Sequence, residues 1–257
     1  MKRYRAILTG ASGGIGRAIA AALAPHCSEL LLVGRDASRL AASAAAAGPV
    51  ARTLIADLAT AAGRDAVSLP GLNLLVNNAG AGDFAWLADQ SDATLARIVE
   101  TNVLAPMQLT RRLLTELARQ PEAWIVNVGS IMGYLGYPGH AAYCASKFAL
   151  RGFSEALRRE LADGPVRVLH LAPRATRTAM NGAGVCAMNA ELGVAMDDPA
   201  LVARELLALL RRPARERLLG MPEALFARLN QLVPGLVDRA LRRQLPIIRR
   251  HAPASSK

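Results

Sequence analysis

Three kinds of segment are missing from this sequence, and each absence argues against a class of protein. No run of uncharged apolar residues approaches the ~18 residues of a membrane-spanning helix. The first residues, Met1-Lys2-Arg3-Tyr4-Arg5, lack the apolar run and the cleavage site of a signal peptide. Three cysteines (Cys27, Cys144 and Cys186) are too few and too scattered for a disulfide framework, and no Cys or His spacing suggests a metal site. We therefore expect a cytoplasmic protein without a metal.

Lysine is also scarce, although the formal net charge is +11. Lys2, Lys147 and Lys257 are the only lysines, and arginine supplies the rest of the positive charge. Arginine has a different shape from lysine and cannot release a proton at ordinary pH. A single interior lysine in an arginine-rich chain indicates a position where the amine itself is required.

Short apolar segments and amphipathic segments alternate along the 257 residues, of which 52% are hydrophobic. Strands that are apolar on both faces and alternate with helices are typical of a parallel sheet covered by helices. We expect an α/β fold with a doubly wound parallel sheet (Rossmann-type), about seven strands and helices on both faces. The expected strands are Arg5–Thr9, Glu29–Val33, Val50–Ala56, Leu72–Val76, Ala123–Val128, Val166–Leu171 and Arg217–Leu219; the expected helices are Gly14–Ala24, one from Asp36 or Ser38 to Gly48, Ser91–Leu104, Pro106–Arg119, Tyr143–Leu161 and Pro199–Arg211.

No internal repeat or low-complexity linker divides the chain. We expect one catalytic domain over residues 1–220, followed by a C-terminal extension, residues 221–257. Residues 211–250 hold ten arginines against three acids, so the basic character is concentrated near this extension. Apolar residues at helical spacing from Glu223 to Ile248 predict an amphipathic helix, kinked or split at Pro234-Gly235. Its apolar stripe suits packing on the body or on a partner subunit, contact with an anionic membrane surface, or recognition of an acidic carrier protein or nucleic acid.

Tyr143 and Lys147 form a Tyr-x-x-x-Lys step, and Ser130 lies thirteen residues upstream at the end of an apolar run. On a helix, residues four apart share a face, so the phenol and the ammonium can address the same small volume. A free phenol has a pKa of ~10, and a fixed cation nearby is expected to lower the pKa toward the working range. This spacing predicts an acid/base centre.

A glycine-rich loop, Thr9–Gly16, stands between the first expected strand and helix. Glycines there permit a tight turn and let the backbone approach a pyrophosphate at the helix N-terminus. The second strand ends in Gly34-Arg35, with glycine where an acid commonly holds the ribose 2′-hydroxyl. Arg35, with the Ser12 hydroxyl beside it, would pair with a 2′-phosphate, so we predict NADP(H). The alternative is that Asp36 holds the ribose, and we favour a helix-capping role for Asp36.

Together these motifs resemble the short-chain dehydrogenase/reductase family, in its common form of about 250 residues. The matching pieces follow in the family's order and spacing from residue 5 to roughly 180. They are Thr9–Gly16, Asp57-Leu58, Asn77-Asn78-Ala79-Gly80, Asn102, Ser130 and Tyr143-x-x-x-Lys147.

The resemblance implies a role for each piece. Tyr143 would exchange a proton with the substrate oxygen, Lys147 would hold the nicotinamide ribose and lower the pKa of Tyr143, and Ser130 would hydrogen-bond the substrate carbonyl. Asn102 would anchor a water in the proton path behind Lys147. The implied cofactor-binding residues are Gly10, Ser12, Gly14, Ile15, Gly16, Arg35, Asp57, Leu58, Asn78, Ala79, Gly80, Tyr143, Lys147, Thr176 and Thr178.

One loop departs from the family pattern. Arg174 follows Pro173 where the family usually has glycine, although Thr176 and Thr178 match positions that meet the nicotinamide carboxamide. Arg174 or Arg177 could recognise an anionic group of the substrate or cofactor, or both could be ordinary surface arginines. Downstream, residues 177–197 read as a flexible, small-residue substrate lid with methionines that favour an apolar ligand.

The sequence therefore predicts an NADP(H)-dependent oxidoreductase that interconverts a carbonyl and an alcohol on an apolar, lipid-, steroid- or acyl-like substrate. One alternative is a β-ketoacyl-carrier-protein reductase. Another, from a different class, is a non-catalytic dinucleotide-sensing or nucleic-acid-binding protein, favoured only by the charge. The resemblance implies a dimer or tetramer formed through the helices Ser91–Arg119 and Tyr143–Leu161, and the basic extension adds possible contact with a membrane surface.

Overall fold

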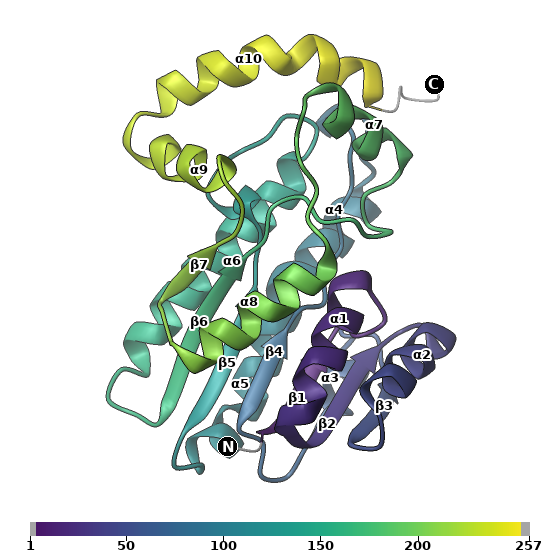
Figure 1. The fold of residues 1–257 in the computed structure, drawn as a ribbon, viewed down its shortest axis with the longest axis vertical. Helices are drawn as coiled ribbons and strands as arrows, with labels where there is room; N and C mark the ends of the chain where they lie inside the picture. Colours follow the sequence, from purple (N-terminus) through teal and green to yellow (C-terminus); the bar gives the residue numbers. More distant parts are fainter. Residues whose placement is uncertain (1–3, 253–257) are drawn as a thin grey trace.

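A computed structural model describes residues 4–252. Residues 1–3, at the start of the N-terminal segment considered above, and 253–257, at the end of the C-terminal extension, lie outside the described residues. Seven strands form one parallel sheet in the order β3-β2-β1-β4-β5-β6-β7 (Figure 1). The strands are β1 (Tyr4–Thr9), β2 (Cys27–Gly34), β3 (Ala51–Ile55), β4 (Leu74–Asn77), β5 (Ala123–Val128), β6 (Val166–Ala172) and β7 (Glu216–Leu218). This is the expected doubly wound fold.

Helices pack on both faces of the sheet because successive strand residues point to opposite faces. In β1, Ala6 and Leu8 belong to one buried cluster, while Ile7 belongs to the cluster on the other face. The first cluster includes residues of α1 (Gly14–Leu23), α2 (Ala37–Ala47) and α8 (Pro199–Arg211), and the second includes residues of α5 (Ala105–Ala118) and α6 (Ala141–Glu160). The core of the protein is thus two apolar layers sandwiching the sheet.

Each expected strand and helix of the body is present, with shifted ends. The sequence did not predict the short helix α3 (Ala61–Asp65), which starts where the Thr60 hydroxyl accepts a hydrogen bond from the Gly63 amide. The helix α4 (Asp92–Val99) continues into α5 through a π-helical turn at Glu100–Leu104, so two expected helices form one bent rod. The expected flexible lid contains a helix, α7 (Ala183–Glu191).

The C-terminal extension forms two helices, α9 (Glu223–Leu232) and α10 (Pro234–His251), and the break falls at Pro234 as expected. Both lie beyond the carboxyl ends of the strands, and α10 runs across the top of the molecule from α9 to α7 (Figure 1). Ile248 of α10 is buried with Phe84 and Met188, and Ala227 of α9 is buried with Ile131 and neighbouring residues. One face of the extension therefore packs on the body of its own chain.

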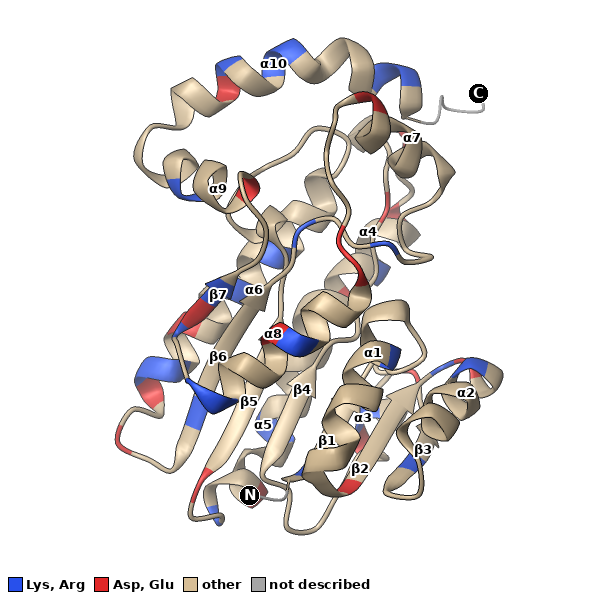
Figure 2. Ribbon diagram, in the orientation of Figure 1, with Lys and Arg blue, Asp and Glu red and all other residues tan. Residues whose placement is uncertain are grey.

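Exposed arginines are spread along α9 and α10 (Figure 2). Within residues 4–252, no helix combines the length and the apolar character needed to cross a bilayer. Over the same residues, no group of three His, Cys, Asp or Glu side chains is placed to hold a metal ion.

Candidate active site

The loop between β1 and α1 is shaped by close backbone approaches that only glycine allows. Gly10 has a φ of +65°, and a Cβ there would lie 2.6 Å from the Ala79 Cα. A Cβ at Gly16 would collide with the Gly10 carbonyl oxygen. Gly13 caps α1 without a side-chain hydrogen bond, and the first turn carries no acid. The first amides of α1 therefore remain open for an anion, as a pyrophosphate group requires.

The ends of β1 and β4 are joined by hydrogen bonds that fix this loop. The Thr9 hydroxyl accepts from the backbone amides of Asn78 and Ala79, both at 3.0 Å. The Asn78 amide group donates back to the carbonyls of Thr9 and Gly10. Sequence reasoning placed Thr9 in the motif but gave it no role of its own. The feature of the sequence that could have indicated this role is the position of Thr9 at the end of the first strand, directly before the glycines.

The side chains expected near the adenosine end lie at the ends of β2 and β3. Arg35 is exposed, and its guanidinium lies 3.9 Å from the Asp57 carboxylate. A Cβ at Gly34 would lie 2.9 Å from the Ser12 hydroxyl, so Ser12 sits directly beside this strand end. Asp57 accepts a hydrogen bond from the Ala59 amide in an Asx turn.

Asp36 caps α2, as favoured from the sequence. Its carboxylate accepts hydrogen bonds from the Arg39 amide and the Ser38 hydroxyl, and the pKa of Asp36 is held below its usual value, chiefly by the first of these bonds. The Asp36 carboxylate is therefore already engaged, whereas Arg35 remains exposed next to Ser12. Leu58, by contrast, is buried in the core, so at that position only its backbone can face a ligand.

Ser130, Tyr143 and Lys147 meet at the carboxyl end of β5. Ser130 lies two residues after the end of β5, and the other two lie one turn apart on α6. The Lys147 Nζ atom lies 5.6 Å from the centroid of the Tyr143 ring and donates a hydrogen bond to the Val128 carbonyl at 3.2 Å. A Cβ at Gly82 would lie 3.4 Å from the Tyr143 ring, so the loop after β4 closes on the phenol. Three of the four side chains predicted to be catalytic are thus brought together, and Asn102 is the fourth.

The expected lowering of the Tyr143 pKa by Lys147 is not found. Burial raises the pKa of Tyr143 to about 12, and the contact with the Ser130 hydroxyl acts in the opposite direction. Burial also lowers the pKa of Lys147 to about 8. Both groups lose their contact with water on folding, and burial therefore drives each toward its neutral form. Tyr143 is accordingly held as a protonated phenol, the form that can donate a proton.

Lys147 makes the folded protein less stable, which gives a prediction. Its folded pKa of about 8 lies below its ordinary value of 10.5, so in this window the unfolded chain binds the extra proton and stability rises with pH. The difference between the two pKa values corresponds to about 3 kcal/mol of destabilisation of the folded state, and this destabilisation is fully present below pH 8. We expect Lys147→Met to raise the free energy of unfolding by up to about 3 kcal/mol at neutral pH, with the gain shrinking toward pH 10.5. Urea unfolding at both pH values measures this, and a variant less stable than the unmodified protein at neutral pH would contradict it.

Asn102 lies in the π-helical turn between α4 and α5. Its amide group accepts from the Ala81 amide at 2.7 Å and donates to the Ala81 carbonyl and the Ser146 hydroxyl. Both of its amide protons are therefore used within the protein. A Cβ at Gly80 would lie 3.5 Å from Asn102 Oδ1 and 3.7 Å from Lys147 Nζ, so these two atoms flank the same small space. Since neither amide proton of Asn102 is free, a water in the expected position would have to donate to an oxygen of Asn102, either the backbone carbonyl or Oδ1.

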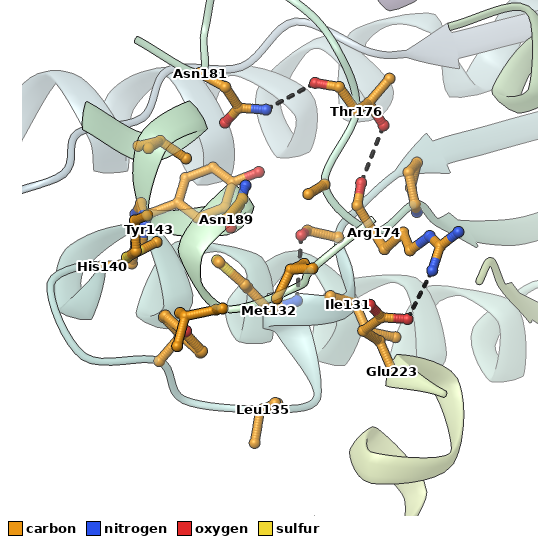
Figure 3. A pocket seen from close by; sticks show the side chains of 18 of the residues that line it. Ile131, Met132, Leu135, His140, Tyr143, Arg174, Thr176, Asn181, Asn189 and Glu223 are labelled. Carbon is orange, nitrogen blue, oxygen red and sulfur yellow. Dashed lines mark hydrogen bonds and ion pairs between the residues drawn. The ribbon is translucent and has the colours of Figure 1, made fainter. Parts of the chain in front are cut away.

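The loop after β6 reaches back to the glycine-rich loop. A Cβ at Gly14 would lie 2.9 Å from the Thr178 methyl group, so Thr178 lies against the start of α1. The Thr176 hydroxyl donates to the Arg174 carbonyl, and the Thr176 carbonyl accepts from the Asn181 amide group (Figure 3). Thr178 therefore lies beside the glycine-rich loop, and Thr176 is tied to Asn181, two residues before α7.

Arg174 fits neither of the two roles considered for it. Its guanidinium forms ion pairs with Asp197 at 2.8 Å and with Glu223 at 2.9 Å, and it also donates to the Met221 carbonyl. Its side chain is only 15% exposed. Among the described residues, no residue other than glycine has a positive φ, so the missing glycine causes no backbone strain here. Arg174 is an internal clamp that ties the lid segment and the C-terminal extension to β6. Arg177, in contrast, is exposed beside Asp198.

A cavity of about 380 Å³ opens next to Ser130 and Tyr143 (Figure 3). Its walls come from the loop after β4, the segment after β5, the lid segment with α7, and the C-terminal extension, and most of the lining is apolar. The sequence did not single out Asp83, Phe84, His140, Asn189 and Gln244, which also line it. No local motif marks them, because they meet only through the tertiary fold.

Comparisons with known proteins agree with this geometry. A family model described as "short chain dehydrogenase" matches residues 4–185. The chain is 30% identical to dehydrogenase/reductase SDR family member 7B of Bos taurus, with 91% of this chain and 79% of that protein covered. A solved short chain dehydrogenase/reductase from Burkholderia phymatum in complex with NAD is 25% identical, with a TM-score of 0.81 over 91% of this chain and 95% of that one. A short-chain dehydrogenase from Sphingobium yanoikuyae in complex with NADPH is 26% identical, with a TM-score of 0.77 over 91% and 94%.

The match to the family model spans well over half of the chain, and the nucleotide loop, the sheet order and the Ser–Tyr–Lys cluster agree with it. The chain therefore belongs to the short-chain dehydrogenase/reductase family of NAD(P)-dependent oxidoreductases.

Proposed function

We propose that this protein interconverts a carbonyl and an alcohol with NADP(H) on an apolar substrate. One observation carries the proposal: Ser130, Tyr143 and Lys147 converge between the open N-terminus of α1 and an apolar cavity. In this proposal residues 1–220 form the catalytic domain and residues 221–257 the C-terminal extension, whose helices α9 and α10 cover the substrate cavity.

Each side chain has a task set by its surroundings. The Ser130 hydroxyl, at the cavity wall beside the phenol, hydrogen-bonds the substrate oxygen as negative charge develops on it. Tyr143 then donates its proton to that oxygen, since an alkoxide is a stronger base than a phenolate even at a raised pKa. Lys147 holds the ribose hydroxyls, and Asn102 is a positioning residue behind it. The bound cofactor supplies or accepts the hydride.

The choice of NADP(H) rests on Arg35, Ser12 and Asp36. Arg35 is exposed, the Ser12 hydroxyl lies beside the preceding residue Gly34, and Asp36 is engaged in capping α2, a combination that suits a 2′-phosphate. The other proposed contacts lie along the glycine-rich loop and the ends of β3, β4 and β6. They are Gly10, Gly14, Ile15, Gly16, Asp57, Leu58, Asn78, Ala79, Gly80, Thr176 and Thr178.

A cofactor titration tests this assignment. We expect Arg35→Ala to raise the Kd for NADPH about ten- to hundred-fold and to leave the Kd for NADH within about two-fold, because only the phosphate contact is lost. Nicotinamide fluorescence measures both constants. Arg39→Ala is the matched control, since Arg39 is an exposed arginine of the same segment that pairs with Asp36. A lower Kd for NADH than for NADPH in the unmodified protein would refute the NADP(H) assignment.

The substrate class follows from the cavity lining. Val185, Val237 and Leu241 present an apolar surface, which favours a lipid, steroid or acyl chain. A β-ketoacyl-carrier-protein reductase is the in-class alternative, with arginines of the extension meeting the carrier. A panel of apolar ketones and acyl thioesters, followed by NADPH absorbance, separates the two. Fluorescence anisotropy with oligonucleotides at physiological salt tests the nucleic-acid alternative.

The corner between α9 and α10 exposes apolar side chains that we call the elbow: Leu232, Val233 and Leu236. Met221 and Leu225, at the start of α9, are exposed as well. Leu232 is 79% exposed and Met221 is 67% exposed, which is unusual for side chains of this size. Arg228 and Arg239 stand within four residues of the elbow in sequence. Figure 2 shows the basic residues of α9 and α10 in blue. We propose that the elbow rests on an anionic membrane surface, where an apolar substrate would be concentrated.

Vesicle co-sedimentation tests the elbow. We expect the protein to pellet with phosphatidylglycerol vesicles, and Leu232→Asp with Leu236→Asp to reduce the bound fraction about ten-fold, because two exposed apolar anchors are replaced by charges that anionic lipid repels. Ile55→Asp is the control, since Ile55 is 62% exposed on β3 at the opposite edge of the sheet. Equal pelleting of the three proteins would remove the elbow from membrane binding.

We also propose a homo-oligomer formed through α4, α5 and α6. Val99, Met107 and Phe148 on these helices are each more than one-third exposed, as apolar side chains at a subunit contact would be in a single chain. Light scattering coupled to size-exclusion chromatography measures the subunit number. A monomer at micromolar concentration would refute this part of the proposal.

A further inference from the structure

Gly129 and His170 interlock directly beside the catalytic serine. Gly129 is the residue before Ser130, and His170 lies on β6, the strand that pairs with β5. A Cβ at Gly129 would collide with Nε2 of His170 and lie 2.5 Å from its Cε1 atom. The imidazole ring therefore fills the space that a side chain at position 129 would need. The proposed mechanism does not use this histidine, and the sequence did not single it out.

The His170 ring is held on two sides. Its Nδ1 atom lies 3.2 Å from the Ser154 hydroxyl, and that hydroxyl gives its single proton to the Leu150 carbonyl. Nδ1 is therefore the donor toward Ser154. The ring also meets the buried Tyr134 ring, with 6.1 Å between the centroids, and His170 is only 1% exposed. Because the ring has no room to move aside, the backbone at Gly129 must absorb any crowding between the two residues.

The His170 ring is neutral. Burial lowers the pKa of His170 to about 3, and the positive charges of Lys147 and Arg151 act in the same direction. Its Nε2 atom is buried and has no hydrogen-bond partner in the described part of the chain. At this position the ring therefore contributes its shape, and neither a charge nor a bond to a ligand.

The backbone on both sides of Ser130 is tied to β6 and to the residue that follows it. The Gly129 amide donates to the Leu171 carbonyl at 2.7 Å, and the Ile131 amide donates to the Pro173 carbonyl at 2.8 Å. Ser130 is thus suspended between two backbone hydrogen bonds, with the ring packed against the residue before it. A displacement of Gly129 would be passed directly to the Ser130 hydroxyl.

We propose that His170 is a positioning residue: its ring sets where the Gly129 backbone lies, and this places the Ser130 hydroxyl beside Tyr143. The Ser130 hydroxyl contacts the Tyr143 phenol, so the two groups that meet the substrate oxygen in the proposed mechanism depend on its placement. An error of about 1 Å in the position of such a group can cost about 100-fold in rate. This inference rests on the proposed function and adds a residue that acts through Ser130.

Two substitutions that correct each other test this role, with NADPH and the most active ketone of the apolar panel. Gly129→Ala should lower kcat/KM about 100-fold, because its methyl group collides with the ring and the backbone shifts. His170→Ala should lower it about ten-fold, because the Gly129 backbone loses the surface on which it packs. The double variant should recover to within about five-fold of the unmodified protein, since the methyl group occupies part of the emptied space.

The melting temperature separates positioning from stability. The double variant should melt below the unmodified protein, because part of the space left by the ring stays empty, and yet it should be more active than either single variant. Gly152→Ala is the matched control: it makes the same change on α6, where the added methyl group meets open space, and should leave kcat/KM unchanged. A double variant as inactive as Gly129→Ala, or a Gly129→Ala variant as active as Gly152→Ala, would overturn the proposal.

A second cycle asks whether the effect passes through Ser130. In a Ser130→Ala background, adding Gly129→Ala should lower kcat/KM by less than about three-fold, because the hydroxyl that it displaces is already gone. A further loss of about 100-fold in that background would mean that the shift acts through another group, and the proposal would be wrong.

Failure of the proposed function gives a different result. If the unmodified protein reduces no ketone of the panel, the proposed function fails, and crystal structures of the variants then decide the role of His170. The Ser130 hydroxyl should move about 1 Å from its place beside the Tyr143 phenol in Gly129→Ala and return to it in the double variant. A Ser130 hydroxyl that does not move in Gly129→Ala would overturn the positioning role.

Discussion

Replacing Tyr143 by phenylalanine is expected to lower kcat/KM for carbonyl reduction by about 10³-fold or more, because the proposed mechanism loses its proton donor to the substrate oxygen. Ser130 lies within reach, but an aliphatic hydroxyl is a much weaker acid than a phenol. The Kd for NADPH should stay within about three-fold, since the glycine-rich loop, Arg35 and Lys147 are untouched. Stopped-flow absorbance measures the first quantity and nicotinamide fluorescence the second.

Tyr4→Phe is the matched control for this experiment. It makes the same chemical change at the start of β1, away from the cavity, and should leave kcat/KM unchanged. Turnover in Tyr143→Phe within ten-fold of the unmodified protein would remove the phenol from the mechanism. Loss of both activity and NADPH binding would mean that Tyr143 acts mainly in cofactor binding.

The second large effect is expected at Arg174. Arg174→Met leaves Asp197, which is 7% exposed, and Glu223 without their shared cation. Breaking a largely buried ion pair from one side costs about 3–5 kcal/mol. Because Glu223 keeps partial access to water, we expect the free energy of unfolding to fall by about 3 kcal/mol and the melting temperature to fall by about 10 °C. The KM for an apolar ketone should rise as well, since the lid segment and α9 lose their common anchor. Calorimetric melting and ketone titration measure these changes.

Arg177→Met provides the control. Arg177 stands three residues along the same loop, but it pairs with Asp198 in solvent, with both side chains more than 60% exposed. Exposed pairs of this kind contribute about 0–1 kcal/mol, so the melting temperature should hardly move. If Arg174→Met had the same melting temperature as Arg177→Met, the ion pairs of Arg174 would contribute nothing to stability. Partial recovery on adding Asp197→Asn would identify the unpaired carboxylate as the cause of the loss.

The parts of the fold that the sequence predicted are those governed by local pattern. Strands such as β5 are short, mostly apolar and wholly buried, and Gly10 and Gly16 mark a turn that no other residue could form. The Asp36 cap was predictable because it involves only neighbouring residues: an aspartate directly before a helix accepts a hydrogen bond from the amide three residues later. The convergence of Ser130, Tyr143 and Lys147 followed from spacing that the family resemblance made specific.

The parts that were missed depend on contacts between segments far apart in the chain. The role of Arg174 depends on Asp197 and Glu223, which are 23 and 49 residues away. His140 and Asn189 meet the same cavity only because α7 packs on Phe84. The pKa of Tyr143 was wrongly expected to fall, because a sequence shows the neighbouring charge but not the loss of water that outweighs it. Such effects come from burial, which no local pattern records.

Because α9 and α10 form part of the cavity wall, the residues that would select the substrate and the residues that would carry out the reaction lie in different segments of the chain. In the proposed mechanism, hydride and proton transfer depend on side chains of the segment after β5 and of α6, whereas Phe226, Val237 and Leu241 come from helices beyond β7. A graft of this final stretch from another enzyme of the same fold would reshape what enters without disturbing the proton donor. The clamp at Arg174 would have to be matched in the graft, so Glu223 is the position to preserve when recombining such enzymes.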